Sequence, residues 1–307
     1  MENQLDENFI HKEHSPHYHF LFVETLDRYL KTNFYDNFPK MHKYFSEAKK
    51  NCDFLTLPDG REIPFGDTDN ALSRTPKYKI PSSEKLTLSG YFVYKDCEDL
   101  TYLALTNSYH STVHKHWDNL SFIFGYKGQD ILMDPGKYKY DNSDHIRKSV
   151  VESKSHNTVN INGLVWGRRN LIKNSLRLIG KIDKKGIVKC FSRIALETHK
   201  EKILINRNMY YYQGFLKIKD RVDIKGNYYS IFILNKDAKL LKINNDGSYI
   251  YIFNETKVSF KFLSDDEKIV LPTIINTPVS YSYGSYNNSI TLKVNFNKTL
   301  DTEMQIL

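Results

Sequence analysis

A long series of short alternating segments, from about residue 85 to the end of the chain, limits the fold more than any other feature. In YFVYK, LTYLALT, YYSIFIL and KVSFKFL, β-branched or aromatic residues alternate with others, which places apolar side chains on one face of a strand. Short turns such as YKGQD, KKG and NNDG separate the segments, and 22 tyrosines and 18 phenylalanines are available to fill inner faces. The pattern predicts a large antiparallel β-sandwich.

The N-terminal part has a helical pattern instead. Residues 16 to 50 carry apolar side chains at helical spacing, with a break at Pro39. A stretch dense in turn-forming residues, LPDGREIPFGDTDN, follows. We therefore predict a mainly β protein with two domains: two helices and a loop in residues 1–80, and the sandwich in residues 81–307. Two helices cannot close a core of their own, so they should dock against the sandwich.

Charge and cysteine usage exclude several classes of protein. The net charge of +8 suits an anionic partner, but the basic residues are scattered and accompany no nucleic-acid-binding motif, so we expect no nucleic acid partner. Cys52, Cys97 and Cys190 show no C-x-x-C spacing, which argues against a disulfide framework or a zinc knuckle. No apolar run reaches 18 residues and the first residues are polar and acidic, so neither a membrane span nor a signal peptide is expected.

Three short segments carry the candidate chemistry. HKHWDNLSF holds His114 and His116, which would share a face if this segment were a strand. ILMDPGKYKY ends an apolar run on Asp134, and KSHNTVNING holds His156. Two imidazoles and a carboxylate from three consecutive strands of one sheet would suit Zn²⁺. The simpler readings are a hydrogen-bonded core histidine and a turn-capping Asp134.

These segments resemble the signature of the heparinase II/III-like polysaccharide lyases. The resemblance rests on HKHWDNLSF, then DPGKYKY, then SHNTV, in that order, together with the upstream stretches SPHYH and LPDGREIPFGDTDN. The family pairs an α/α toroid with a C-terminal antiparallel β-sandwich. The resemblance therefore implies that residues 1–80 are the last helices of such a toroid.

The resemblance also implies roles for individual residues. Tyr18 corresponds to the tyrosine that serves as Brønsted acid, and in some members as base, and His114 to the active-site histidine. The ligands of a structural divalent metal, zinc in the family, are implied to be His116, Asp134 and His156. Substrate contacts are implied at Tyr138 and Arg147. Apart from the resemblance, Tyr18 is an ordinary residue of an amphipathic helix and Arg147 a solvated charge.

The implied activity is that of a carbon–oxygen lyase acting on an acidic polysaccharide by β-elimination. The family's carboxylate-neutralising Asn or His lies on an earlier toroid helix, whereas only 17 residues precede Tyr18. We therefore expect an incomplete lyase that needs an upstream toroid fragment or forms a homodimer, with the apolar side chains of Phe20, Phe22 and Leu26 uncovered.

Two other functions remain open on the sequence. One is a catalytically inactive carbohydrate-binding or structural β-sandwich. The other is a zinc hydrolase that would use His114, His116 and Asp134 around an open metal site. The family resemblance further implies a location in the cell envelope or periplasm and no membrane partner. It leaves open which polymer is bound.

Overall fold

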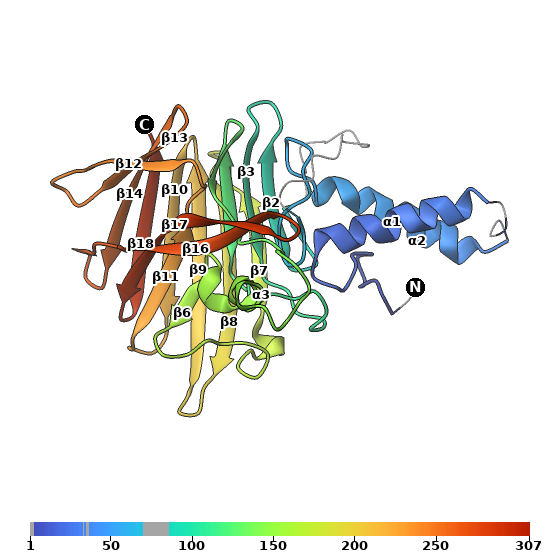
Figure 1. Cartoon of the computed structure of the whole chain (residues 1–307), viewed down its shortest axis with the longest axis horizontal. Coiled ribbons are helices and arrows are strands. Elements are labelled where there is room, and N and C mark those ends of the chain that lie inside the picture. The colour runs from blue at the N-terminus through green and yellow to red at the C-terminus, as the bar shows by residue number, and fades with distance from the viewer. Residues whose placement is uncertain (1–2, 33, 35–36, 70–85) are drawn as a thin grey trace.

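The structure, a computed structural model, describes residues 3–32, 34, 37–69 and 86–307. Within these residues the strands form three antiparallel sheets, and a helical hairpin projects from one side of them (Figure 1). The predicted β-sandwich and its preceding helices are confirmed. The predicted domain boundary between residues 80 and 81 lies outside the described residues.

The site sheet carries the loops of the candidate site. Its strands, in spatial order, are β1 (Thr87–Leu88), β2 (Tyr91–Asp96), β3 (Thr101–Thr106), β4 (Phe122–Tyr126) and β5 (Gln129–Leu132). The small sheet lies beside it, joined by a bridge from Leu132 to Leu234. Its strands, in spatial order, are β16 (Thr273–Ser282), β17 (Ser285–Phe296), β11 (Tyr228–Ile233) and β6 (Val159–Ile161).

The large sheet faces the other two across the main hydrophobic core. Its strands, in spatial order, are β12 (Ala238–Ile243), β13 (Tyr249–Phe253), β14 (Thr256–Ser264), β18 (Thr299–Ile306), β10 (Phe215–Val222), β9 (Lys202–Tyr212), β8 (Val188–Glu197) and β7 (Arg177–Ile182), with β15 (Lys268–Ile269) added on β14. Alternation accounts for the packing, since Phe122 and Phe124 of β4 point into this core while Ile123 points to the opposite side.

The helical hairpin consists of α1 (Pro16–Leu30) and α2 (Pro39–Phe54). Each begins with a proline at its first turn, where the missing N–H costs no hydrogen bond, so Pro39 starts the second helix as well as interrupting the pattern. The helices share a second core with the outer face of the site sheet, which explains why every residue of β3 is buried. A short helix, α3 (His145–Val151), and two 3-10 turns, η1 (Ser153–Ser155) and η2 (Lys173–Ser175), complete the described elements.

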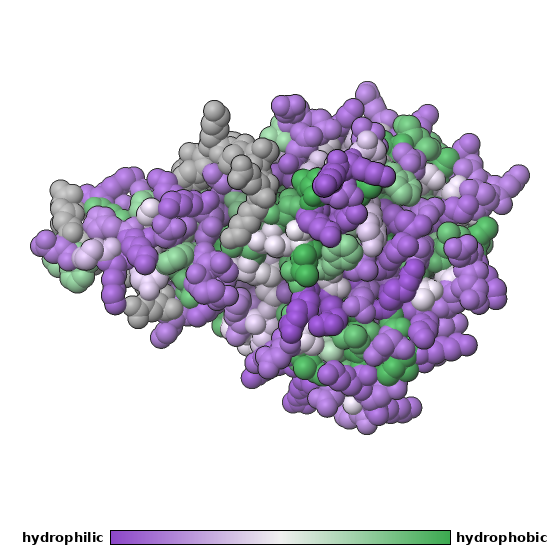
Figure 2. Space-filling view, turned by 180° about the vertical axis from the view of Figure 1, so that it is seen from behind, coloured by the Kyte–Doolittle hydropathy of each residue, from purple (hydrophilic) through white to green (hydrophobic). Residues whose placement is uncertain are grey.

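The prediction that the apolar face of α1 is uncovered is wrong for two of its three residues. Phe20 and Leu26 are buried, at 7% and 4% exposure, and only Phe22 is partly exposed. On the hairpin itself, the exposed large apolar side chains among the described residues are Tyr29, Phe34 and Phe38, toward its far end. Viewed from behind, most of the surface is hydrophilic and the apolar groups form scattered patches (Figure 2). No helix among the described residues is long and apolar enough to span a membrane.

Candidate active site

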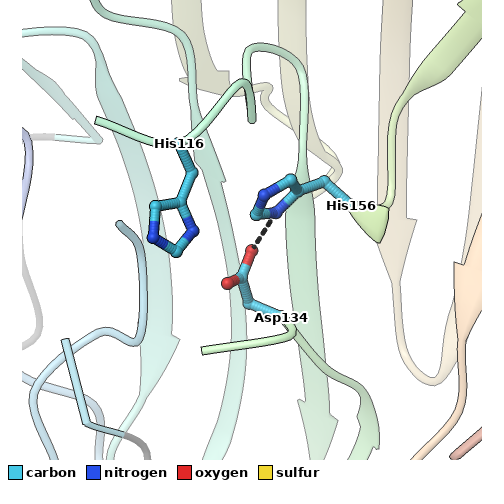
Figure 3. A group of neighbouring side chains, drawn as sticks. All are labelled: His116, Asp134 and His156. Carbon is cyan, nitrogen blue, oxygen red and sulfur yellow. Dashed lines mark hydrogen bonds and ion pairs between the residues drawn. The ribbon is translucent and has the colours of Figure 1, made fainter. Parts of the chain in front are cut away.

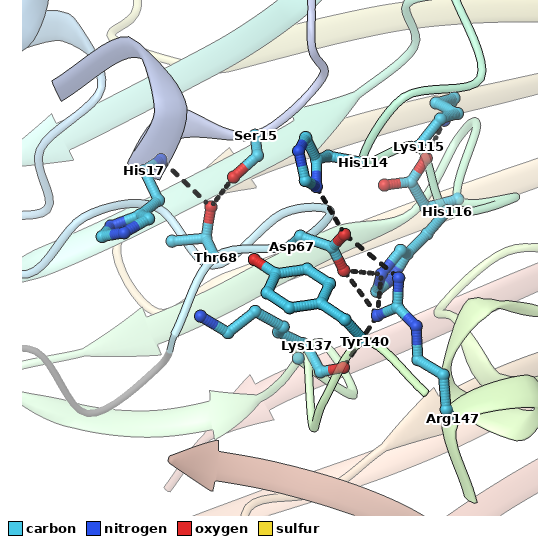
Figure 4. Close-up of polar contacts among 12 residues, drawn as sticks. Ser15, His17, Asp67, Thr68, His114, Lys115, His116, Lys137, Tyr140 and Arg147 are labelled. Atoms are coloured by element: carbon cyan, nitrogen blue, oxygen red, sulfur yellow. Dashed lines mark hydrogen bonds and ion pairs between the residues drawn. The ribbon is translucent and has the colours of Figure 1, made fainter. Parts of the chain in front are cut away.

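Asp67, at the end of the loop that follows α2, is the centre of the candidate site (Figure 4). Its Oδ2 lies 2.9 Å from Nδ1 of His114, and its Oδ1 lies 2.9 Å from Nε2 of His116. The guanidinium of Arg147 contacts the same two oxygens at 2.5 and 3.0 Å. One buried carboxylate therefore joins the predicted active-site histidine to a predicted metal ligand.

The surroundings of Asp67 set its charge and the tautomers of both histidines. Burial alone would raise the pKa of Asp67, but hydrogen bonds from His114, His116 and Arg147 hold that pKa well below its usual range. An ionised carboxylate only accepts hydrogen bonds, so His114 donates from Nδ1 and His116 donates from Nε2. In the neutral imidazoles, the lone pairs are then on Nδ1 of His116 and on Nε2 of His114, which lies 3.6 Å from a carboxylate oxygen of Glu13.

Tyr18 lies face to face with His114. Their ring centroids are 3.8 Å apart, with 16° between the ring planes. The hydroxyl of Tyr18 is 2.7 Å from that of Tyr140, which comes from the segment after β5. Burial, and then the hydrogen bond with Tyr18, raises the pKa of Tyr140, so Tyr140 remains a neutral phenol at physiological pH. A cleft of about 340 Å³ opens beside His114 and Tyr140, with Trp117 on its wall.

The residue next to Asp67 positions the helix that carries Tyr18. The hydroxyl of Thr68 lies 2.8 Å from that of Ser15 and accepts a hydrogen bond from the backbone N–H of His17 at 3.2 Å. Thr68 thereby satisfies a free N–H in the first turn of α1, a task that the N-cap Ser15 does not perform with its own side chain. Asp67 and Thr68 together tie His114 and Tyr18 to one short segment.

The histidine pair lies in a loop, so the prediction that it alternates on a strand is wrong. β3 ends at Thr106 and β4 begins at Phe122, and between them His114 has a positive φ of 52°. The two imidazoles meet the same carboxylate because the loop folds back toward Asp67. The backbone at His114 can approach the segment before Asp67 this closely only because residue 66 is glycine. A Cβ at Gly66 would lie 2.9 Å from the carbonyl oxygen of His114 and 2.4 Å from that of His14.

The three predicted metal ligands do come together. His116, Asp134 and His156 are fully buried, and one ligand atom from each lies within 4.8 Å of the others (Figure 3). The prediction that they lie on three consecutive strands of one sheet is wrong. His116 is in the loop before β4, Asp134 follows β5, and His156 precedes β6 of the small sheet.

The hydrogen bonds of this cluster fit a bound cation. His156 Nδ1 lies 2.9 Å from Oδ2 of Asp134, so Nε2 of His156 keeps its lone pair. Neither this atom nor Nδ1 of His116 has a hydrogen-bond partner, although both are buried. Burial lowers the pKa of His116 despite its hydrogen bond to Asp67, which favours the neutral imidazole that a metal requires. Two bare nitrogens beside a carboxylate form a donor set that suits zinc.

A second buried network holds the three loops in place. The side-chain amide of Asn157 donates to the carbonyls of Phe122 and Met133, at 2.7 and 2.9 Å, and its oxygen accepts from the N–H of Ile233. Arg207, on the large sheet, pairs with Asp220 at 2.7 Å and donates to the carbonyls of Leu120 and Asn157. The SHNTV motif thus places His156, a predicted metal ligand, directly before Asn157. The side chain of Asn157 joins the site sheet to the small sheet.

Tyr138 and Arg147 are more enclosed than a role in substrate contact suggests. Tyr138 is 8% exposed and packs against Ile146 and Val150 of α3. Arg147 is 7% exposed and paired with Asp67, although it lines the cleft. Their contact with substrate stays a prediction. The arrangement adds Asp67 and Tyr140, which were not predicted, although both lie in stretches of the sequence that carry the resemblance.

The fold and site together define an antiparallel β-sandwich with a tyrosine–histidine pair at the junction with its helices. Residues 80–221 match the family model described as "Heparinase II/III-like, C-terminal". The resemblance inferred from the motifs is therefore confirmed over these residues, which make up somewhat less than half of the chain. No match to the chain was found among curated proteins.

Solved structures of heparinase III share the fold. Heparinase III, the BT4657 gene product, superposes over 100% of this chain with a TM-score of 0.82 and 16% sequence identity. Heparan sulfate lyase HepC from Pedobacter heparinus superposes over 99% with a TM-score of 0.79, also at 16% identity. This chain covers 54% of each of those proteins, about half of their length.

Proposed function

We propose that the protein is a lyase that cleaves an acidic, uronate-containing polysaccharide by β-elimination. The observation that carries the proposal is the stack of Tyr18 on His114, with the Tyr18 hydroxyl hydrogen-bonded to Tyr140 and the imidazole oriented by Asp67. This geometry supplies a proton donor and a proton acceptor on one wall of a cleft, and β-elimination needs both.

In the proposed reaction, the unprotonated Nε2 of His114 or the Tyr18 oxygen removes the proton from C5 of a uronic acid. The electron pair of that C–H bond forms the C4=C5 double bond as the C4–O4 bond breaks, and the leaving oxygen takes a proton from Tyr18. No water is consumed. Asp67 contributes by keeping the imidazole in the tautomer whose free nitrogen faces away from the carboxylate.

The reaction also needs a positive or hydrogen-bonding group against the uronate carboxylate. Among the described residues around the cleft, the cations are already paired: Arg147 with Asp67, Lys115 with Asp118, and Lys137 with Asp69. We propose that a further helical segment of the toroid supplies this group. A groove of about 640 Å³, lined by apolar side chains of α1 and α2 such as Leu21, Phe22 and Met41, opens beside Tyr18 and would receive such a segment.

We also propose that His116, Asp134 and His156 hold a divalent metal, zinc by their donor set. A metal at this position would bind three loops together and thereby support the loop that presents His114, which is a structural role. The zinc hydrolase alternative receives less support, because His114 contacts Asp67 and Tyr18 and is not part of the ligand cluster.

The paired cations favour one alternative, a carbohydrate-binding sandwich without turnover. A spectrophotometric assay on heparan sulfate, hyaluronan and alginate separates the two, because elimination creates a C4=C5 double bond that absorbs in the ultraviolet. We expect slow formation of unsaturated product by this chain alone and faster formation when a toroid fragment is co-expressed. Binding without unsaturated product, in both preparations, would support the binding module and contradict the lyase.

The location and the partners are part of the same proposal. From the family resemblance we place the protein in the cell envelope or periplasm, with an acidic polysaccharide as its partner. A homodimer through the groove beside α1 is the alternative to a toroid partner. Cell fractionation tests the location, and the molar mass in solution distinguishes the homodimer from a complex with a toroid fragment.

A further inference from the structure

An exposed tyrosine lies next to the candidate active site and has no role in the chemistry proposed for it. Tyr283 occupies the turn between β16 and β17 and is 60% exposed, one of the most exposed large side chains among the described residues. Its ring centroid is 6.0 Å from that of Tyr140, with 48° between the ring planes. Because Tyr140 is hydrogen-bonded to Tyr18, the Tyr283 ring extends the row of aromatic rings that begins at the proposed proton donor.

The hairpin that carries Tyr283 is fastened to the segment that carries Tyr140. The backbone N–H of Gly284 donates to the carbonyl of Tyr138 at 2.7 Å, and that of Ser280 donates to the carbonyl of Pro135 at 2.8 Å. At Gly136, a Cβ would lie only 2.4 Å from the carbonyl oxygen of Ser280, so the two segments are in direct backbone contact. The hairpin tip is therefore held in place relative to the cleft although it lies at the surface.

Lys137 holds the two rings from one side. Its Nζ is 5.6 Å from the centroid of Tyr140 and 5.6 Å from that of Tyr283, within the range of a cation–π contact. The same ammonium lies 2.9 Å from Oδ2 of Asp69, and the lysine side chain is only 7% exposed. Lys137 is thus a buried residue that contacts both rings, and its charge is balanced by Asp69. Tyr283 and Tyr140 themselves remain 60% and 41% exposed.

We propose that Tyr283, together with Tyr140, forms an aromatic subsite for a pyranose ring adjacent to the uronate that reacts. An aromatic face binds the C–H face of a sugar, and the phenol hydroxyl offers a hydrogen bond to sugar hydroxyls. The ammonium that contacts both rings, that of Lys137, is paired with Asp69, so the subsite recognises the shape of the sugar and not its charge. This inference rests on the proposed function, since it needs a polysaccharide in the cleft.

Calorimetric titration with hexasaccharides and disaccharides of heparan sulfate, hyaluronan and alginate tests the subsite. We expect Tyr283→Ala to weaken the binding of a hexasaccharide by about 3- to 10-fold, the order of one aromatic contact. Tyr283→Phe should retain most of the affinity, because it keeps the ring and loses only the hydroxyl. Tyr212→Ala removes another exposed tyrosine, at the β9–β10 turn, and should change nothing. The disaccharides, which supply the uronate and one adjacent ring, should show the same order of affinities among the variants.

The outcomes separate this inference from the function on which it rests. If the wild-type protein binds none of the hexasaccharides, the proposed function fails and the subsite fails with it. If wild type and Tyr283→Ala bind a hexasaccharide equally well, the subsite alone is wrong. A loss in Tyr283→Phe as large as in Tyr283→Ala would also contradict the inference, because recognition would then depend on the hydroxyl and not on the ring.

Discussion

Tyr18 and His114 are stacked at a ring-centroid distance of 3.8 Å, although they are 96 positions apart in the sequence. The contact exists because Asp67 orients the imidazole and Thr68 anchors the first turn of the helix that carries the phenol. The loop after α2 therefore controls the geometry of both proposed catalytic side chains. Substitutions in this loop can therefore be compared with substitutions of Tyr18 and His114 themselves.

Substitution of either member of the stack should abolish elimination. Tyr18→Phe removes the proton donor, and His114→Ala removes the imidazole that either takes the C5 proton itself or stacks on the Tyr18 ring, so we expect each to lower kcat by roughly 10²- to 10⁴-fold. The rate of formation of ultraviolet-absorbing product measures this. Tyr212→Phe is the control and should keep the wild-type rate. Full activity in either active-site variant would exclude that residue from the proton transfers.

Asp67→Asn should lower both stability and activity. The change leaves the buried guanidinium of Arg147 without its carboxylate, which should cost about 3 kcal/mol in the free energy of unfolding. It also lets the imidazole of His114 adopt the wrong tautomer, so kcat should fall more than KM changes. Urea unfolding and steady-state kinetics measure the two effects. Asp59→Asn, a partly exposed position in the same loop, should cost at most about 1 kcal/mol.

The metal prediction concerns the cluster of His116, Asp134 and His156. We expect elemental analysis to find about one divalent ion per chain, and a chelator to lower the melting temperature, because an ion that binds only the folded state stabilises it. His156→Ala should lose the ion, whereas His110→Ala, outside the cluster, should retain it. A metal-free protein whose melting temperature responds to neither chelator nor added zinc would refute the site.

The helical hairpin should become less stable in mild acid. His19 is buried between α1 and α2, where Nε2 lies 2.9 Å from the carbonyl oxygen of Ala48, and burial lowers its pKa to about 4 from 6.5. The unfolded chain therefore binds a proton on this residue before the folded one does. Stability should be complete above pH 6.5 and fall as the pH drops toward about 4, by at most about 3 kcal/mol.

Urea midpoints across this pH range, compared with those of a variant, measure the contribution of His19. His19→Gln should make the dependence shallower. It should not abolish it, because burial also lowers the pKa of His14, to about 2, and this residue acts in the same direction. His42→Gln, at an exposed position on α2, is the matched control. An identical slope in the His19 variant and the wild type would show that His19 does not cause the effect.

Arg207 should matter far more than its neighbour Arg221. Arg207→Met leaves Asp220 buried without its partner and frees the carbonyls of Leu120 and Asn157, which should cost about 3 to 5 kcal/mol. Arg221→Met breaks the partly exposed pair with Asp301 on the same sheet, for about 0 to 1 kcal/mol. Equal losses in the two variants, measured by urea unfolding, would contradict the assignment of Arg207 as the buried anchor.

The strands and the proximity of His116, Asp134 and His156 could be predicted because each depends on local patterns in the sequence. Alternation in segments such as FIF of β4 reflects a core on one side and the helices on the other. His116, Asp134 and His156 were identified through short motifs, each of which lies where a strand begins or ends. The expectation for Phe20 and Leu26 failed because exposure depends on what packs against α1, and local periodicity does not reveal that partner.

The sequence by itself determined a mainly β protein with two helices before it, and a set of tyrosine, histidine and aspartate residues suited to proton transfer and metal binding. Only the tertiary structure decided how these groups meet. Asp67 lies 47 residues from His114, 49 from His116 and 80 from Arg147, yet its two oxygens contact all three. No periodicity connects positions so far apart. Their contact depends on the closure of loops from both the helical part and the site sheet, which is a property of the assembled core.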